Sequence, residues 1–257
     1  MKKIILFMLT SVVVLLMGCN KDQSTYEKIQ KSKEMSFAMT GAYPPFNFIN
    51  EEGELDGFDI DIANALAEQM GVKAVPITTA WDGIIGGLES SRFDTIIGSM
   101  AITEERLERV SFTQPYYYDG AQFFTVSSSE LTSIEELENG KVGVVTGTTF
   151  HDALLQMENI TQILQFESDV DNFMTVEQGR SDGLVTAKFV GLQAPEKYGV
   201  DIKPVGPMLY AENIGIAVRK DDEELLNALN ESLDKIIENG TYSQISDKWF
   251  GVNILEK

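Results

Sequence analysis

The chain has 257 residues, of which 43% are hydrophobic, enough to bury the core of one large domain or two small ones. Its 40 aspartates and glutamates outnumber its 20 lysines and arginines, which gives a formal net charge of -20. This balance argues against a nucleic-acid partner and against electrostatic docking on anionic lipid, since both need a basic protein surface. We expect the acidity to serve solubility.

The first residues are typical of an export signal. Two lysines precede an apolar run over residues 4–17, which is too short to span a bilayer comfortably. The run leads to Gly18 and Cys19, and a small residue before a lone cysteine resembles the bacterial lipoprotein processing site. We therefore expect residues 1–18 to be a signal peptide, and lipid on Cys19 to hold the exported protein on the extracytoplasmic side of the cell membrane. The alternative is an ordinary cleaved signal with a bystander cysteine.

The mature chain offers few groups for crosslinks or metals. Cys19 is the single cysteine and His151 the single histidine of the sequence. A disulfide within the chain is therefore impossible, and no second ligand stands at zinc-like spacing from the histidine. We expect no metal and no cofactor. The polar stretch 19–33 is typical of a flexible tether.

After this stretch, short β-branched apolar runs alternate with amphipathic segments. The predicted strands cover 35–39, 72–77, 95–99, 142–145, 161–166, 183–186 and 214–218. The predicted helices cover 58–70, 82–90, 103–110, a stretch from 150, 170–178, 225–240 and a final face over 242–249.

Local signals mark some of the helix ends. Thr103 is expected to cap the helix that follows it, and Ser133 with Glu136 fits a capping box. The alternation of strands and helices predicts an α/β fold with mainly parallel sheets. Ligands bind such sheets beyond the carboxyl ends of the strands, so we expect a site in the loops that follow Ser99, Val145 and Thr186.

Several motifs, in order along the chain, carry a specific resemblance. They are Tyr43-Pro44-Pro45-Phe46-Asn47-Phe48, Gly57-Phe58-Asp59-Ile60-Asp61, Trp81-Asp82-Gly83, Phe93-Asp94, Ile102-Thr103-Glu104-Glu105-Arg106, Phe112-Thr113-Gln114-Pro115-Tyr116, Gly143-Val144-Val145-Thr146-Gly147-Thr148-Thr149 and Gly179-Arg180-Ser181-Asp182. Together they resemble the family 3 extracellular solute-binding proteins, the capture subunits of polar amino-acid importers. The resemblance covers roughly residues 35–251.

The resemblance implies a two-lobed periplasmic-binding-protein type II fold. Each lobe would be a mainly parallel sheet flanked by helices, and two strands would form the hinge. The first lobe would comprise 34–126 and 213–257, and the second 127–212. Ligand would bind in the cleft, the lobes would close on it, and the permease of an ABC importer would bind the closed form. We expect a monomer.

The resemblance also implies a site, and Arg106 is its central residue. The matching arginine in the family holds the α-carboxylate of the ligand, and the planar guanidinium suits a carboxylate in two parallel hydrogen bonds. The alternative is that Arg106 pairs with the glutamates of its own helix. Tyr43 and Trp81 match the rings that flank the ligand side chain. The implied ligand-binding set is Thr40, Tyr43, Trp81, Ser99, Met100, Ala101, Arg106, Thr149, Thr186, Ala187 and Glu212.

Two positions of this set depart from the family pattern. Where the family has an acid for the ligand ammonium, this chain has Ala187, and where several members have aspartate near the first aromatic ring, it has Thr40. Because a buried ammonium without an acid partner is costly to desolvate, another acid must substitute or the amino group is held differently. Glu212 is one candidate and Asp119 a weaker one. The missing acid at Thr40 argues against arginine, lysine or histidine as ligands, although the two rings could accept a cation.

The expected function is therefore capture of a small polar carboxylate, foremost an amino acid, without chemistry. One alternative is a ligand-sensing lipoprotein that acts through a partner receptor. The other is a dehydratase-type enzyme on the same fold, which would need a general acid or base in the cleft.

Overall fold

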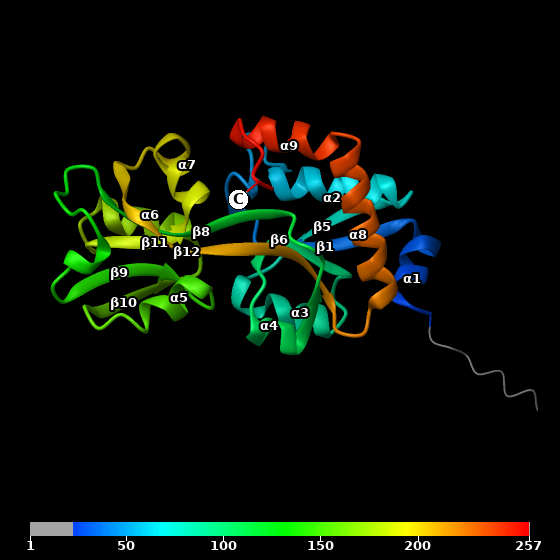
Figure 1. Cartoon of the computed structure of the whole chain (residues 1–257), viewed down its shortest axis with the longest axis horizontal. Coiled ribbons are helices and arrows are strands. Elements are labelled where there is room, and N and C mark those ends of the chain that lie inside the picture. The colour runs from blue at the N-terminus through cyan, green and yellow to red at the C-terminus, as the bar shows by residue number, and fades with distance from the viewer. Residues whose placement is uncertain (1–22, 257) are drawn as a thin grey trace, which may run out of the picture.

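The computed structural model describes residues 23–256, which form two α/β lobes joined by two long strands (Figure 1). These strands are β8 (Tyr117–Val126) and β12 (Ile202–Arg219). They pair antiparallel from Tyr117 opposite Ile214 to Val126 opposite Ile202, with an irregularity between Val205 and Tyr210. The sheets of both lobes are therefore continuous through this pair, which forms the predicted two-strand hinge.

The first lobe is built on the strand order β12-β6-β1-β5, in which β1 pairs parallel with both β5 and β6. Its strands are β1 (Glu34–Met39), β5 (Lys73–Thr78), β6 (Thr95–Ala101) and β7 (Val110–Phe112), with a small sheet of β2 (Ala42–Tyr43), β3 (Asn47–Ile49) and β4 (Leu55–Asp56). Its helices are α1 (Thr25–Ser32), α2 (Phe58–Gln69), η1 (Trp81–Gly83), α3 (Ile84–Glu89), α4 (Glu104–Arg109), α8 (Glu223–Glu238) and α9 (Thr241–Phe250).

The second lobe has the strand order β10-β9-β11-β8, parallel except for the β11–β8 pair. Its elements are η2 (Ile134–Glu136), β9 (Gly140–Val145), α5 (Thr149–Leu154), β10 (Ile160–Phe166), α6 (Asp169–Glu177), β11 (Gly183–Ala187) and α7 (Lys188–Tyr198). The expected fold class, two lobes of mainly parallel sheet flanked by helices, is confirmed.

The strand β8 joins the sheet of the second lobe before Val126, the residue at which the first lobe was expected to end. Ala121 already pairs with Ala187 of β11, and Phe124 pairs with Leu184. Residues 121–126 thus belong to the second lobe's sheet. A strand that crosses between two lobes keeps one apolar pattern along its length, because it is buried at both ends, so its sequence carries no mark of the crossing.

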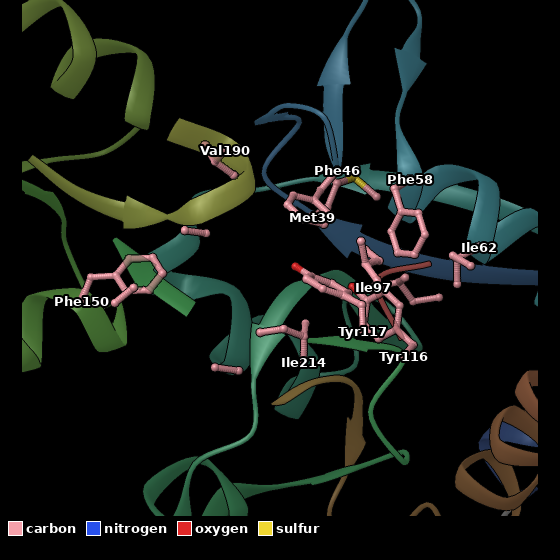
Figure 2. Close-up of a cluster of buried hydrophobic side chains, with 14 of the residues drawn as sticks. Met39, Phe46, Phe58, Ile62, Ile97, Tyr116, Tyr117, Phe150, Val190 and Ile214 are labelled. Atoms are coloured by element: carbon pink, nitrogen blue, oxygen red, sulfur yellow. The ribbon is translucent and has the colours of Figure 1, made fainter. Parts of the chain in front are cut away.

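Aromatic side chains fill the first lobe next to the hinge (Figure 2). Phe46 stacks on Tyr117 with ring centroids 4.7 Å apart, and Phe58 stacks on Tyr116 at 6.0 Å. All four side chains are buried. Such large, close-packed rings make this end of the lobe rigid, so that the residues bordering the cleft are held in place.

The N-terminal stretch corrects one prediction. A flexible tether is expected over 19–33, but α1 occupies residues 25–32 and packs on the first lobe, with Ile29 only 1% exposed. The Ser24 side chain and Glu27 form a capping box, and Thr25 donates a 2.7 Å hydrogen bond to Asp222. One buried isoleucine in a polar segment is a weak periodic signal, and the contacts of α1 with α8 come from the far end of the chain. The predicted signal peptide and Cys19 lie outside the described residues.

Two smaller differences concern helix signals. The capping box expected at Ser133 and Glu136 is wrong, since Glu136 instead accepts hydrogen bonds from the backbone and hydroxyl of Thr132. The helix α7 contains Pro195, and it has no counterpart among the predicted helices. Within residues 23–256, no helix is both long enough and apolar enough to cross a bilayer.

Candidate ligand-binding site

A cavity lies between the lobes, and the three loops expected from the sequence all border it. Its empty volume is about 690 Å³, which includes solvent at its mouth. Most of the predicted set line it, namely Thr40, Tyr43, Trp81, Ser99, Ala101, Arg106, Thr149, Ala187 and Glu212. Residues far apart in the sequence and from both lobes are therefore brought together.

Two predicted residues do not line this cavity. The Met100 side chain is 1% exposed and packs in a separate apolar cluster of the first lobe, and Thr186 is fully buried. Each lies in a strand beside a residue that does line the cavity, Ala101 and Ala187 respectively. Because successive side chains in a strand point to opposite faces, Met100 faces away from the cavity. The Thr186 side chain instead lies behind the lining residues Tyr43 and Asp169 and hydrogen-bonds both.

Arg106 is held at one end of the cavity by both lobes. Its Nη1 donates to the carbonyl of Ala101 at 2.9 Å, and its Nη2 donates across the cleft to the carbonyl of Gly147 at 3.4 Å. The guanidinium also lies over the ring of Trp81, with Cζ 5.5 Å from the centroid. Burial lowers the pKa of Arg106, but arginine stays charged in proteins. With five N–H donors and two of them used here, the guanidinium retains donors for a ligand carboxylate.

Arg106 does not pair with the glutamates of its own helix, which was the alternative expected from the sequence. No ion pair within 4.0 Å joins it to a carboxylate among the described residues. The nearby Arg109 instead forms such a pair, with Glu89 at the protein surface. Thr103 caps the helix as expected, since its side chain accepts from the Arg106 backbone N–H at 3.2 Å.

A buried carboxylate, Asp59, organises the first-lobe side of the site. It accepts hydrogen bonds from Asn47 at 2.7 Å, from the Ser99 hydroxyl at 2.9 Å and from the Tyr116 hydroxyl at 2.7 Å. The Ser99 backbone N–H donates to the same tyrosine oxygen at 3.0 Å. Ser99 has φ 62°, a conformation that costs free energy for a non-glycine residue and persists where the surroundings enforce it. Burial raises the pKa of Asp59 to about 6.

The hinge contributes two acids to the cavity. Asp119 and Glu212 lie directly opposite each other in the β8–β12 pair, and both line the cavity. The Thr149 hydroxyl of the second lobe donates to Glu212, and the backbone N–H of Phe189 donates to Asp119 at 3.4 Å. Burial raises the pKa of Asp119 to about 7 and also raises that of Glu212.

Asp119 stands next to the position where the usual acid is missing. Asp119 is two residues from Ala121, the strand partner of Ala187, and its N–H donor Phe189 is two residues beyond Ala187. The carboxylate of one strand thus lies beside the methyl group of the next. From the sequence, Asp119 is only the weaker candidate for the missing acid. The pattern of a hinge strand does not show which residues of the neighbouring strands its side chains will lie beside.

A third acid, Asp169, was not predicted. It is the first residue of α6, lines the cavity from the second lobe and is 4% exposed. Its carboxylate lies beside the Thr186 hydroxyl and the Asn172 side chain, whose hydrogen bonds favour the charged form. Burial raises its pKa to about 7. In the sequence, an acid in the first turn of a helix is so common that it carries no signal for a site.

The lobes also contact each other on both flanks of the cavity. On one flank, the Trp81 Nε1 donates to the carbonyl of Gly147 at 3.0 Å, where the turn has a φ of 72° that glycine tolerates. On the other flank, Lys197 Nζ lies 4.3 Å from the ring centroid of Phe48. Such contacts between lobes stabilise an arrangement in which the cavity is enclosed.

Comparison with known proteins agrees with this geometry. The family model of the bacterial extracellular solute-binding proteins, family 3, matches residues 35–252. The L-cystine-binding protein TcyJ of Escherichia coli strain K12 is 29% identical over 235 residues, covering 91% of this chain and 88% of TcyJ. The L-arginine-binding protein of Pseudomonas aeruginosa is 34% identical over 86% of this chain and 90% of its own.

The solved structures give the same result. The ancestral amino acid-binding protein AncCDT-1, described as a precursor of cyclohexadienyl dehydratase, superposes with a TM-score of 0.82. It is 34% identical, and the match covers 89% of this chain and 100% of AncCDT-1. The family match, spanning both lobes, the hinge and the cavity between them, shows that this chain belongs to the bacterial extracellular solute-binding proteins, family 3.

Proposed function

We propose that this protein captures an amino acid outside the cytoplasm and delivers it to an ABC importer. The observation that carries the proposal is the set of charged groups that line the cavity, namely Arg106 and the buried or half-buried acids Asp119, Asp169 and Glu212. A zwitterion that bears a carboxylate and an ammonium group complements this arrangement. The relatives named as cystine- and arginine-binding proteins support the same class of ligand.

In this proposal, the guanidinium of Arg106 binds the α-carboxylate in charge-assisted hydrogen bonds. The α-ammonium lies against the hinge acids Asp119 and Glu212, which replace the acid missing at Ala187. The rings of Tyr43 and Trp81 enclose the ligand side chain, and Ser99 and Thr149 contribute hydroxyl groups. Lipid on Cys19 would keep the loaded monomer close to the permease.

A thermal-shift screen against amino acids tests the proposal. A ligand that binds only the folded state raises the melting temperature, by on the order of 10 °C at a thousandfold excess over Kd. We expect at least one amino acid to do so. Arg106→Ala should weaken its binding at least about 100-fold, since a charge-assisted bidentate contact is lost. The matched control is Arg109→Ala, on the same helix, whose side chain pairs with Glu89 at the surface.

Two outcomes contradict the proposal in different ways. If no amino acid shifts the wild-type melting temperature, the amino-acid assignment is wrong. If Arg106→Ala binds the ligand as tightly as Arg109→Ala does, the carboxylate role of Arg106 is wrong and the capture function stands.

A second candidate function is an enzyme of the dehydratase type. Two observations favour it: the paired acids Asp119 and Glu212 in the cavity, and the likeness to a dehydratase precursor. His151, the other potential acid–base group, does not line the cavity. The bound ligand recovered unchanged after prolonged incubation would support capture without chemistry, and a dehydrated product would support the enzyme. A third candidate function is ligand sensing, in which the loaded protein acts on a separate receptor. Co-purification of the loaded protein with the permease would support import instead.

A further inference from the structure

A carboxylate buried behind the wall of the cavity has no cationic partner in the described part of the chain. Asp59 belongs to α2, is fully buried and does not itself line the cavity. No basic side chain among residues 23–256 forms an ion pair with it within 4.0 Å. Burial raises its pKa to about 6, so the carboxylate is ionised at pH 8. Since a buried charge is costly without an opposite charge, a cation close to Asp59 would stabilise it.

The hydrogen bonds around Asp59 have a fixed direction. The backbone N–H of Ser99 donates to the Tyr116 oxygen at 3.0 Å, and the Tyr116 hydroxyl donates to Asp59 at 2.7 Å. The Ser99 hydroxyl lies 2.9 Å from the same carboxylate. Because an ionised carboxylate can only accept, Ser99 donates its one hydroxyl proton to Asp59. No proton of this hydroxyl is left for the cavity.

The same reasoning applies to Thr40, which is linked to Asp59 through the amide of Asn47. The backbone N–H of Gly41 donates to the Asn47 Oδ1 at 2.9 Å, so the Nδ2 faces Asp59 and donates to it at 2.7 Å. The Thr40 hydroxyl lies 3.1 Å from that amide oxygen and therefore donates to it. The N–H of Ala42, at 3.4 Å, uses one lone pair of the hydroxyl and leaves the other.

Two hydroxyl groups that can only accept form a surface for a hydrogen-bond donor. Ser99 and Thr40 both line the cavity, on the side formed by the first lobe. An ammonium group donates and cannot accept, whereas a carboxylate oxygen would meet only lone pairs here. Hydrogen bonds in a chain polarise one another, so a hydroxyl that donates to a carboxylate becomes a stronger acceptor. The charge of Asp59 is thus presented to the cavity through the Ser99 oxygen.

We propose that Asp59 is a positioning residue for the ligand ammonium, because it holds the hydroxyl proton of Ser99 directly and that of Thr40 through an amide. Both oxygens then accept from the ammonium group. This inference rests on the proposed capture of an amino acid, and it adds a first-lobe partner to the hinge acids. An ammonium group has enough N–H donors for these oxygens and one hinge carboxylate. Where several family members have aspartate, this chain has Thr40 with a buried carboxylate behind it.

Ligand pairs with and without the ammonium group test the inference by isothermal titration calorimetry at pH 8. L-Glutamine is compared with glutaramic acid, L-leucine with isocaproic acid, and L-arginine with δ-guanidinovaleric acid, since each acid lacks only the α-ammonium group. An amino acid outside these pairs that raises the melting temperature is compared with its own des-amino analogue. We expect the amino acid of at least one pair to bind at least about 100-fold more tightly than its analogue.

In Asp59→Asn, this ammonium preference should fall at least about 10-fold, because the amide carries no charge and brings a donor of its own into the network. Binding of the des-amino analogue should stay within about 3-fold of the wild type, since the analogue does not use these oxygens. The matched control is Asp61→Asn, on the same helix, which pairs with Lys248 at 2.7 Å and should keep the wild-type preference.

Two hydroxyl variants decide the question even if Asp59→Asn does not fold. Ser99→Ala and Thr40→Val each remove one acceptor with little change in shape. In the double variant, the ammonium preference should fall at least about 10-fold. Combining Asp59→Asn with Ser99→Ala should lower the preference by less than the product of the two separate effects, because the carboxylate acts through that hydroxyl.

The outcomes separate the inference from the capture function. An equal loss for both members of a pair in Asp59→Asn would show a merely structural role, and the inference would be overturned while amino-acid capture stands. The same conclusion follows if the wild type has no ammonium preference, or if Asp59→Asn or the double hydroxyl variant keeps it in full. If no amino acid binds the wild type at all, the capture function fails and the inference with it.

Discussion

At the residue scale, the site lacks a carboxylate at one strand position and has one on the neighbouring strand. Ala187 presents a methyl group where the resemblance leads one to expect an acid, and Asp119 places its carboxylate beside it from the neighbouring strand. The Asp119 carboxylate is held by the backbone N–H groups of Gly120 and Phe189. An acid in this position can meet the same ligand ammonium from a different strand, so the missing acid need not mean a missing contact.

An exchange of these two positions tests the compensation. Asp119→Ser should weaken ligand binding at least about 10-fold, because a charge-assisted contact is removed. Adding Ala187→Asp to this variant should restore the affinity to within about 3-fold of the wild type. Ala187→Asp alone should bring no gain, since two adjacent carboxylates repel each other. Calorimetric titration of the three variants checks this, and a gain from Ala187→Asp alone would contradict it.

At the element scale, contacts between loops and helices join the two lobes on both flanks of the cavity. The η1 segment reaches the loop after β9 through Trp81 and Gly147. On the other flank, α7 of the second lobe meets α9 of the first, where the Phe189 and Phe250 ring centroids lie 5.0 Å apart. Small contacts of this kind can break without unfolding either lobe, which suits opening about the hinge.

Trp81→Phe should shift the ligand-free protein toward an open form. It removes one hydrogen bond between the lobes, worth about 1 kcal/mol or roughly fivefold in the closed population, and keeps an aromatic ring. The matched control is Trp249→Phe, which loses a hydrogen bond to Asp61 within the first lobe. The radius of gyration from small-angle X-ray scattering should rise for Trp81→Phe alone. Equal values for both variants would show that this bond does not hold the lobes together.

At the scale of the whole molecule, buried acids add to a high negative charge. The net charge is -20, and burial raises the pKa of Asp59 to about 6 and those of Asp119 and Asp169 to about 7. In the unfolded chain these groups titrate near 4. Between about pH 4 and pH 7 the folded state therefore binds more protons than the unfolded state, so the free energy of unfolding decreases as the pH rises.

We expect the melting temperature of the ligand-free protein to fall by on the order of 5–10 °C from pH 5 to pH 8. The general repulsion of surface acids acts in the same direction. The double variant Asp119→Asn/Asp169→Asn separates the two causes, because it removes two of the buried groups and leaves the surface unchanged. Its melting temperature should depend less steeply on pH. A slope as steep as that of the wild type would assign the effect to the surface charge.

Much of the fold and part of the site follow from sequence alone. The alternation of apolar runs and amphipathic helices determines the α/β class, and the motif around Arg106 places a cation after a strand. Local patterns suffice for these two predictions, because the spacing of apolar residues and the capping of helices depend on residues that are near each other in the chain. The helix α1 is the counterexample, since it contacts α8 and Thr25 hydrogen-bonds Asp222, 197 positions further along the chain, which a local pattern cannot show.

Only the tertiary structure decided which acids line the cavity. Strand alternation turns Met100 away from the cavity, and the pairing of β8 with β11 and β12 sets Asp119 beside Ala187 and opposite Glu212. Asp169 reaches the cavity because the second lobe lies against β2 of the first. The sequence by itself determined the family, the two-lobed architecture and Arg106 as the candidate for binding a carboxylate. The set of acids in the cavity was decided by the fold, because it exists only where two lobes and two crossing strands meet.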